Sequence, residues 1–167
     1  MNTELIHLLY DYNYWAHQLV WNNSINALSN ADFERSLDYS WGSVKAQVVH
    51  TMSSEWMWFQ RLNGTSPAAQ FNPADYPDRA SIRTQWSTIE SQVRAYLSTL
   101  SADKLQGTFT YSTTSGKTYT QKVGEILLHV VNHGTDHRAQ TLAMLARLGA
   151  PTVEQDLIFY LRERAMG

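Results

Sequence analysis

The chain has 167 residues and a formal net charge of −2, with 13 lysines and arginines against 15 aspartates and glutamates. This length fits one domain, residues 1–167, and the near-neutral charge without a basic run argues against nucleic acid as a partner. The sequence has no cysteine, which excludes disulfides, thiolate metal sites and a cysteine nucleophile. It has neither a signal-peptide pattern nor a membrane-spanning apolar stretch, so we expect a cytoplasmic protein with no membrane partner.

The first half of the chain predicts two long helices. Apolar residues recur at helical spacing over residues 3–28, and a capping box formed by Ser29 and Asp32 predicts a short helical turn after them. The second helix covers residues 43–62 and is apolar almost all round, so we expect it to be well buried. Residues 64–77 hold three of the four prolines and predict a surface connection within the domain.

The second half begins with a helix and a hairpin. The helix starts near Asp78 or Ser81 and runs to Leu100. Residues 107–123 then alternate in polarity, are rich in threonine and tyrosine, and carry a turn sequence with Gly116 at their centre. This pattern predicts a small β-hairpin.

Two further helices complete the chain. One covers residues 121–148 and ends at Gly149, in the order expected of helix stop signals. A capping box formed by Thr152 and Gln155 predicts the start of the last helix, which ends near Ala165. We therefore expect an all-α protein. Its architecture would be an up-and-down four-helix bundle with an extra C-terminal helix and a small β-hairpin before the last bundle helix.

The histidines carry the functional argument. Three of the six lie in the fourth predicted helix, where His133 and His137 are four residues apart and project from one face. Gly134 leaves space next to them. A third ligand must come from another helix, and His50, in the middle of the second helix, is the candidate. Three neutral imidazoles with one open position are typical of a catalytic metal site, although a histidine inside a helix is often an ordinary core or surface residue.

Five other residues are weaker candidates for a supporting or pocket-lining role. His129 lies one turn before the histidine pair. Asp136 could complete a two-histidine, one-carboxylate site, but it points about 60° away from the pair. Arg138 could orient an anionic substrate or form a surface salt bridge. His17 could reach the site if the first and fourth helices pack together, and Trp15 belongs either to a pocket or to an aromatic core stripe.

Four pieces of the sequence occur in a characteristic order. They are the segment YNYWAHQ at 12–18, the segment VVHTMSSEWMWFQRLNG at 48–64, the hairpin, and the segment LLHVVNHGTDHRAQ at 127–140. Together they resemble the DinB family of bacterial metal-binding helical bundles, and the pattern HxxNHxxxHRxQ is the most specific element. The chain departs mildly from the family at His17, where members often have asparagine, and at Ala139, where glycine is usual.

The resemblance implies a homodimeric four-helix bundle in which His50, His133 and His137 hold one divalent transition metal ion. Zinc and nickel are the first choices, with iron or manganese as alternatives. For the activity it implies a metal-dependent enzyme that activates a low-molecular-weight thiol for transfer to a small electrophile. The partners would then be a small-molecule substrate and a thiol cosubstrate. Two alternatives are a metal-dependent hydrolase that activates water and a non-catalytic metal-binding stress-response protein.

Overall fold

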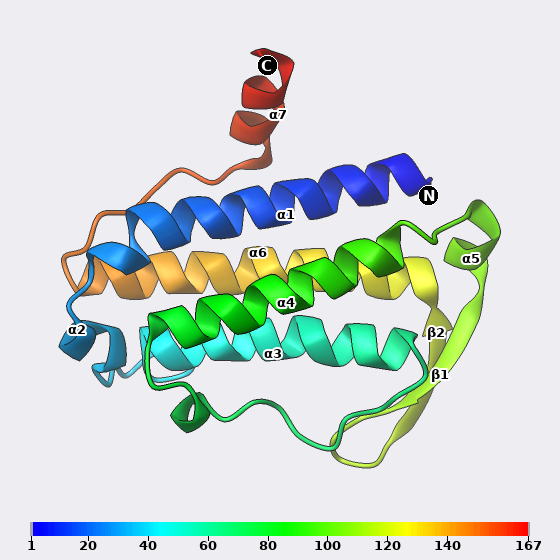
Figure 1. Ribbon diagram of the computed structural model, residues 1–167, viewed down its shortest axis with the longest axis horizontal. Coiled ribbons are helices and arrows are strands. Elements are labelled where there is room, and N and C mark those ends of the chain that lie inside the picture. Colours follow the sequence, from blue (N-terminus) through cyan, green and yellow to red (C-terminus); the bar gives the residue numbers. More distant parts are fainter. Residues whose placement is uncertain (1, 167) are drawn as a thin grey trace.

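Four long helices form the body of the protein, and three shorter helices and a hairpin are attached to them (Figure 1). The computed structural model describes residues 2–166. The long helices are α1 (Thr3–Asn23), α3 (Val44–Leu62), α4 (Arg79–Leu97) and α6 (Val123–Arg147). The other elements are α2 (Asn30–Glu34), α5 (Ala102–Gln106), α7 (Leu157–Met166), the strands β1 (Thr108–Ser112) and β2 (Thr118–Lys122), and short 3₁₀ turns at Ile25–Ala27 and Pro73–Asp75.

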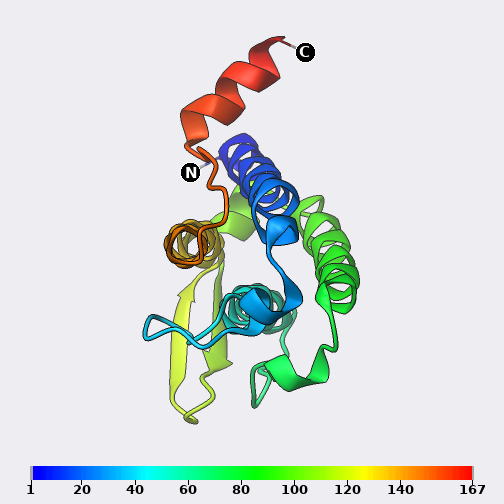
Figure 2. The same ribbon diagram turned by 90° about the vertical axis from the view of Figure 1, so that its left-hand side faces the viewer.

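The long helices lie side by side around a shared core, with α6 next to both α1 and α3, and α4 on the opposite side (Figure 2). The most deeply buried side chains come from all four helices, including Tyr10, Met52, Ile89 and Leu127. The mostly helical fold predicted from the apolar spacing is confirmed. The strict up-and-down order that the sequence favours is not confirmed, because α3 and α4 run in the same direction and residues 63–78 cross back between them (Figure 1).

The two strands form an antiparallel hairpin beside one end of the α3–α6 pair (Figure 2). Thr110 pairs with Thr120 at the centre of the ladder, and Gly116 supplies the positive φ of 82° that the tight turn requires. Tyr111 is the buried residue of β1, and its side chain packs edge-on against Trp58 of α3. The hairpin therefore covers part of α3, the helix that carries His50.

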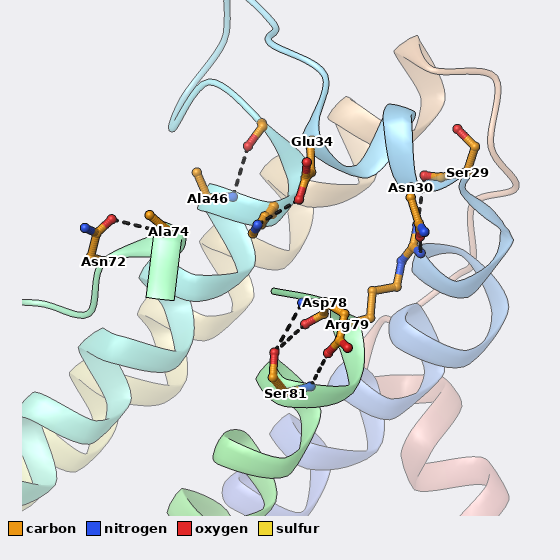
Figure 3. A network of polar contacts seen from close by, with 11 residues as sticks. Ser29, Asn30, Glu34, Ala46, Asn72, Ala74, Asp78, Arg79 and Ser81 are labelled. Carbon is orange, nitrogen blue, oxygen red and sulfur yellow. Dashed lines mark hydrogen bonds and ion pairs between the residues drawn. The ribbon is translucent and has the colours of Figure 1, made fainter. Parts of the chain in front are cut away.

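Polar caps fix where the helices begin, as Figure 3 shows around the start of α4. The side chain of Asp78 accepts a hydrogen bond from the Ser81 backbone at 2.7 Å, and the Ser81 hydroxyl completes a capping box. Arg79 donates to Asn30 Oδ1 at 2.6 Å and to the carbonyl of Ser29 at 2.9 Å, so it ties the first turn of α4 to α2. The predicted cap at Ser29 is confirmed, because its side chain accepts from the backbone of Asp32.

Two predicted helix boundaries were wrong. The first helix ends at Asn23 and is followed by a separate 3₁₀ turn, because the backbone leaves the helical region at Ser24. The last helix begins at Leu157, not at a capping box of Thr152 and Gln155. Gln155 is used elsewhere: its side-chain oxygen accepts from Arg138 at 2.7 Å and its carbonyl accepts from Tyr12 at 2.9 Å.

The C-terminal helix α7 projects from the body, and its main contact with the body is along α1 (Figures 1 and 2). The contact is aromatic: Tyr160 lies against Tyr12 and Trp15, with ring centroids 6.1 and 5.6 Å apart. Within the described residues, no helix is both long enough and apolar enough to cross a membrane.

Candidate metal centre

The structure brings His50 of α3 together with His133 and His137 of α6. One ring nitrogen from each histidine belongs to a set whose members all lie within 4.8 Å of one another. The two α6 rings are 4.1 Å apart between centroids, and the His50 ring lies 4.6 Å from His137 and 5.4 Å from His133. We call these three residues the histidine triad. Three imidazole nitrogens converging on one point form a donor set that suits zinc, nickel or ferrous iron.

Two glutamine side chains form hydrogen bonds with Nδ1 of two histidines of the triad. His50 Nδ1 lies 3.0 Å from Gln70 Oε1, so this nitrogen carries the proton and donates to the amide oxygen. That bond leaves His50 Nε2 free of a proton, with Ser54 Oγ 3.5 Å away. On the α6 side, the amide nitrogen Nε2 of Gln47 donates to His137 Nδ1 at 2.7 Å, so Nδ1 is the acceptor and the neutral ring carries its proton on Nε2. A metal at Nε2 of His137 requires the other tautomer, with the proton on Nδ1 and the Gln47 amide turned.

The triad lies in surroundings that keep its imidazoles neutral. Burial, as the largest cause, and the nearby His137, His50 and His129 together lower the pKa of His133 to about 3. Burial is also the main cause of the lowered pKa of His50 and of His137. Because a metal binds the neutral form of imidazole, the triad at pH 7 can accept a cation without first losing a proton.

Aromatic rings surround the triad. Trp41, on the connection before α3, stacks on His50 with the centroids 3.9 Å apart and the planes at 19°, although about half of Trp41 is exposed. His129 is exposed beside His133, with a centroid distance of 5.7 Å, and meets Trp58 edge-on at 5.2 Å. The rings therefore shield the triad while leaving one side near the surface.

The other predicted site residues lie in different places. Asp136 is exposed on α6 and accepts a hydrogen bond from the side chain of Gln140 at 3.1 Å. His17 is buried between the helices, with its ring 4.5 Å from that of Trp86. Trp15 faces α7 and donates to Glu163 at 3.0 Å. None of these three belongs to the group of converging ligand atoms within residues 2–166.

Arg138 is buried inside the bundle, only 2% exposed, and does not form a surface salt bridge. Its guanidinium donates to Asn13, to Thr135 and to Gln155. A Cβ added at Gly134 would stand 2.6 Å from Asn13 Oδ1 and 3.3 Å from the Arg138 guanidinium. The missing side chain at Gly134 therefore makes room for this pair of residues rather than for a histidine.

Glu55 is a buried acid on the other side of α3. Its two carboxylate oxygens accept hydrogen bonds from Tyr14 at 3.0 Å and from Trp86 at 2.9 Å. Burial raises its pKa to about 7, although both donors pull the pKa down. We call Asn13, Tyr14, Glu55, Trp86 and Arg138 the interior cluster, because all five are buried between the long helices.

Sequence reasoning missed three residues that contact the triad: Trp41, Gln47 and Gln70. Gln47 precedes His50 by three residues, so helical spacing put it on the same face and could have identified it. Trp41 and Gln70 lie on connections between helices, where no periodicity predicts which way a side chain points. The sequence carried no signal for these two.

Comparisons with known proteins agree with this geometry. The family model described as DinB family matches residues 1–166. A curated relative, Protein DinB of Bacillus subtilis (strain 168), is 25% identical over 158 residues, which cover 92% of this chain and 91% of that protein. This mostly helical protein with a histidine triad between two of its long helices therefore belongs to the DinB family.

Proposed function

We propose that the protein binds one divalent transition metal ion through His50, His133 and His137, with zinc or nickel as the first choices. In the metal-loaded form it activates a low-molecular-weight thiol for transfer to a small electrophile. The observation that carries the proposal is the convergence of three neutral imidazole nitrogens within 4.8 Å. Three protein ligands leave a coordination position for a small molecule, which distinguishes a catalytic site from a closed structural one.

The donor set fits such an ion. The Nδ1–H of His50 donates to Gln70, and the amide nitrogen of Gln47 donates to Nδ1 of His137. The first bond fixes the His50 ring and raises the basicity of the nitrogen that faces the metal, and the second fixes the orientation of the His137 ring. When bound, the ion supplies Lewis acidity, which lowers the pKa of a thiol and so favours the thiolate.

The chain's own residues bind and orient the reactants. The protein has no cysteine, so the sulfur nucleophile comes from a cosubstrate. Trp41 covers one face of His50 and limits the access of water, while the half-exposed indole leaves a path for a small molecule. These features support a site that admits a small thiol.

Hydrolysis is the less favoured alternative. A metal hydrolase needs a general base close to the attacking water, and no carboxylate of residues 2–166 joins the triad. Asp136 is hydrogen bonded to Gln140 on the surface, and both oxygens of Glu55 are occupied by Tyr14 and Trp86. A non-catalytic metal-binding protein is the other alternative, in which the ion acts as a clamp between α3 and α6.

The homodimer and the cytoplasmic location implied by the family resemblance belong to the same proposal. Support for a dimer comes from α7, which has no buried residue and carries the exposed apolar side chain of Ile158. A helix that projects in this way offers apolar surface to a second copy.

The test is a conjugation assay at pH 7, with cysteine as the thiol and 1-chloro-2,4-dinitrobenzene as the electrophile. We expect a rate above the uncatalysed one for zinc- or nickel-loaded protein, and no enhancement for chelated protein or for His133→Ala. Metal content, measured on the same samples, separates the outcomes. A loaded protein with no enhancement for any small thiol supports the non-catalytic alternative, and equal rates with and without metal contradict thiol activation by a metal.

A further inference from the structure

Arg61, in the last turn of α3, is a buried cation without an anionic partner. It is only 7% exposed, and none of the four ion pairs within residues 2–166 involves it. Its Nε has no hydrogen-bond partner among the described residues. The buried Nε–H has lost its water without gaining an acceptor, which costs free energy unless a ligand completes the site.

Aromatic rings hold the Arg61 side chain in place. Its guanidinium carbon lies 4.6 Å from the ring centroid of Trp58 and 5.3 Å from that of Tyr111. These cation–π contacts fix a planar fork of N–H donors, so little side-chain entropy remains to be lost when an anion binds. Burial lowers the pKa of Arg61, although the group stays charged at neutral pH.

A cleft of about 220 Å³ lies against this guanidinium. Its lining includes Ser54, Trp58, Arg61, Gln70, Thr113 and Thr114. Arg61 is the only charged side chain among the lining residues, and hydroxyl and amide groups account for most of the rest. One fixed positive charge with neutral hydrogen-bonding neighbours matches a single carboxylate better than a doubly charged phosphate.

The cleft adjoins the histidine triad. Two of its lining residues contact His50 directly: Gln70 lies 3.0 Å from Nδ1, and Ser54 lies 3.5 Å from Nε2. Arg61 follows His50 by eleven residues on the same helix, which corresponds to three turns and a rise of about 16 Å. Both side chains therefore project from nearly the same face of α3, with the cleft between them.

We propose that this cleft binds the carboxylate of a small-molecule substrate or thiol cosubstrate, held by Arg61, so that the rest of the molecule extends toward the triad. This proposal rests on the proposed function for what happens at the triad, but the carboxylate site itself is independent of the metal. It identifies the substrate class as small carboxylic acids. Arg61, and not the buried Arg138, is then the arginine that orients an anionic substrate.

The test compares two probes of equal length, 6-mercaptohexanoate and 6-mercapto-1-hexanol, by isothermal titration calorimetry at pH 7. The full-length protein is treated with chelator, so that neither probe binds through a metal. We expect the acid to bind wild-type protein at least about tenfold more tightly than the alcohol, as a charge-assisted fork of hydrogen bonds allows. In Arg61→Gln the ratio of the two Kd values should fall to about one.

Two further variants keep the test decisive. Arg147→Gln is the matched control, because Arg147 also lies over an aromatic ring, at 4.5 Å from Tyr39, but does not line the cleft. It should keep the wild-type ratio. Arg61→Lys retains the charge and the long apolar stem, so it preserves folding if Arg61→Gln does not. Its loss of the bidentate fork should lower the ratio several-fold.

The proposal is overturned if the acid and the alcohol bind wild-type protein equally or not at all. An unchanged ratio in both Arg61 variants overturns it as well, and means that Arg61 serves only to pack against Trp58 and Tyr111. His133→Ala distinguishes the two proposals, because it should lose metal but keep the wild-type ratio. A protein that binds no metal but still needs Arg61 for the acid contradicts the proposed function and supports the carboxylate site.

Discussion

The histidine triad and the interior cluster are two groups of buried polar side chains that share helices α3 and α6 but are arranged in opposite ways. In the interior cluster, Glu55 meets a donor at each oxygen and Arg138 meets three acceptors. In the triad, three imidazole nitrogens, one from each histidine, lie within 4.8 Å of one another, and no hydrogen bond within residues 2–166 joins two of the three rings.

The difference separates polar groups that stabilise a fold from polar groups that bind a ligand. A completed hydrogen-bond network offsets the desolvation of its members and fixes how the helices pack. Converging imidazole nitrogens contribute favourable free energy only when they bind a cation or a hydrogen-bond donor. Changes in the interior cluster should therefore alter stability, and changes around the triad should alter metal affinity.

The largest effect on stability should come from Gly134→Ala. The added Cβ would stand 2.6 Å from Asn13 Oδ1, so Asn13 or Arg138 must move and their hydrogen bond weakens. We expect a loss of about 2–3 kcal/mol in the free energy of unfolding, measured with urea. Metal binding should still reach one equivalent. In a double-mutant cycle, Gly134→Ala should cost less stability in an Asn13→Ala background than in wild type, because the clashing Oδ1 is gone. If the effects of the two changes on stability were strictly additive, the clash would be contradicted.

Glu55→Gln should change how stability depends on pH. The pKa of Glu55 is about 7 in the folded protein, above the value of 4.5 expected when unfolded. The folded state therefore holds more protons between these values, and the carboxyl destabilises the fold increasingly as pH rises through this window. Relative to wild type, the metal-free variant should gain about 2 kcal/mol in the free energy of unfolding between pH 5 and pH 8.

The control for this pH effect is Glu154→Gln, which removes an exposed carboxyl from the connection before α7. That variant should show no comparable change relative to wild type between the same two pH values. A Glu55→Gln protein whose stability stays parallel to wild type across the window would mean that Glu55 titrates normally. The interior cluster would then not be the desolvated network described above.

A smaller effect, confined to the triad, is expected from Gln70→Ala. The change removes the acceptor of the His50 Nδ1 proton, so the ring loses its fixed orientation. We expect zinc affinity to fall about tenfold in a chelator competition assay, with the stability of the metal-free protein almost unchanged. Gln18→Ala, on the exposed side of α1, should leave both quantities as in wild type. A large stability loss in Gln70→Ala with unchanged zinc affinity would mean that Gln70 stabilises the fold and does not orient His50 for metal binding.

The parts of the structure that sequence predicted well are those set by helical periodicity. His133 and His137 follow from their spacing on one helix, and the long apolar run around His50 predicted a buried partner helix. The spacing did not show whether α1 packs beside α6, and it gave no reason to expect Arg138 in the interior. A buried arginine depends on acceptors such as Asn13 and Gln155, which come from distant segments.

The parts that sequence did not predict depend on such long-range contacts. Thr152 and Gln155 form a valid local capping pattern, yet Gln155 is engaged by Arg138 and Tyr12, so tertiary contacts override the cap. Trp41 and Gln70 reach the triad from connections whose path is set by the packing of the whole fold. The sequence could therefore predict which histidines come together, and it could not predict the groups that orient and cover them.

The most direct test of the account is the metal content of protein purified without a histidine tag, beside His133→Ala and a control variant, His7→Ala, at an exposed histidine of α1. After incubation with zinc or nickel and removal of excess ion, we predict about one equivalent in wild type and in His7→Ala, and almost none in His133→Ala. Wild-type protein that holds no zinc, nickel, iron or manganese would contradict the metal centre, as would equal metal content in all three proteins.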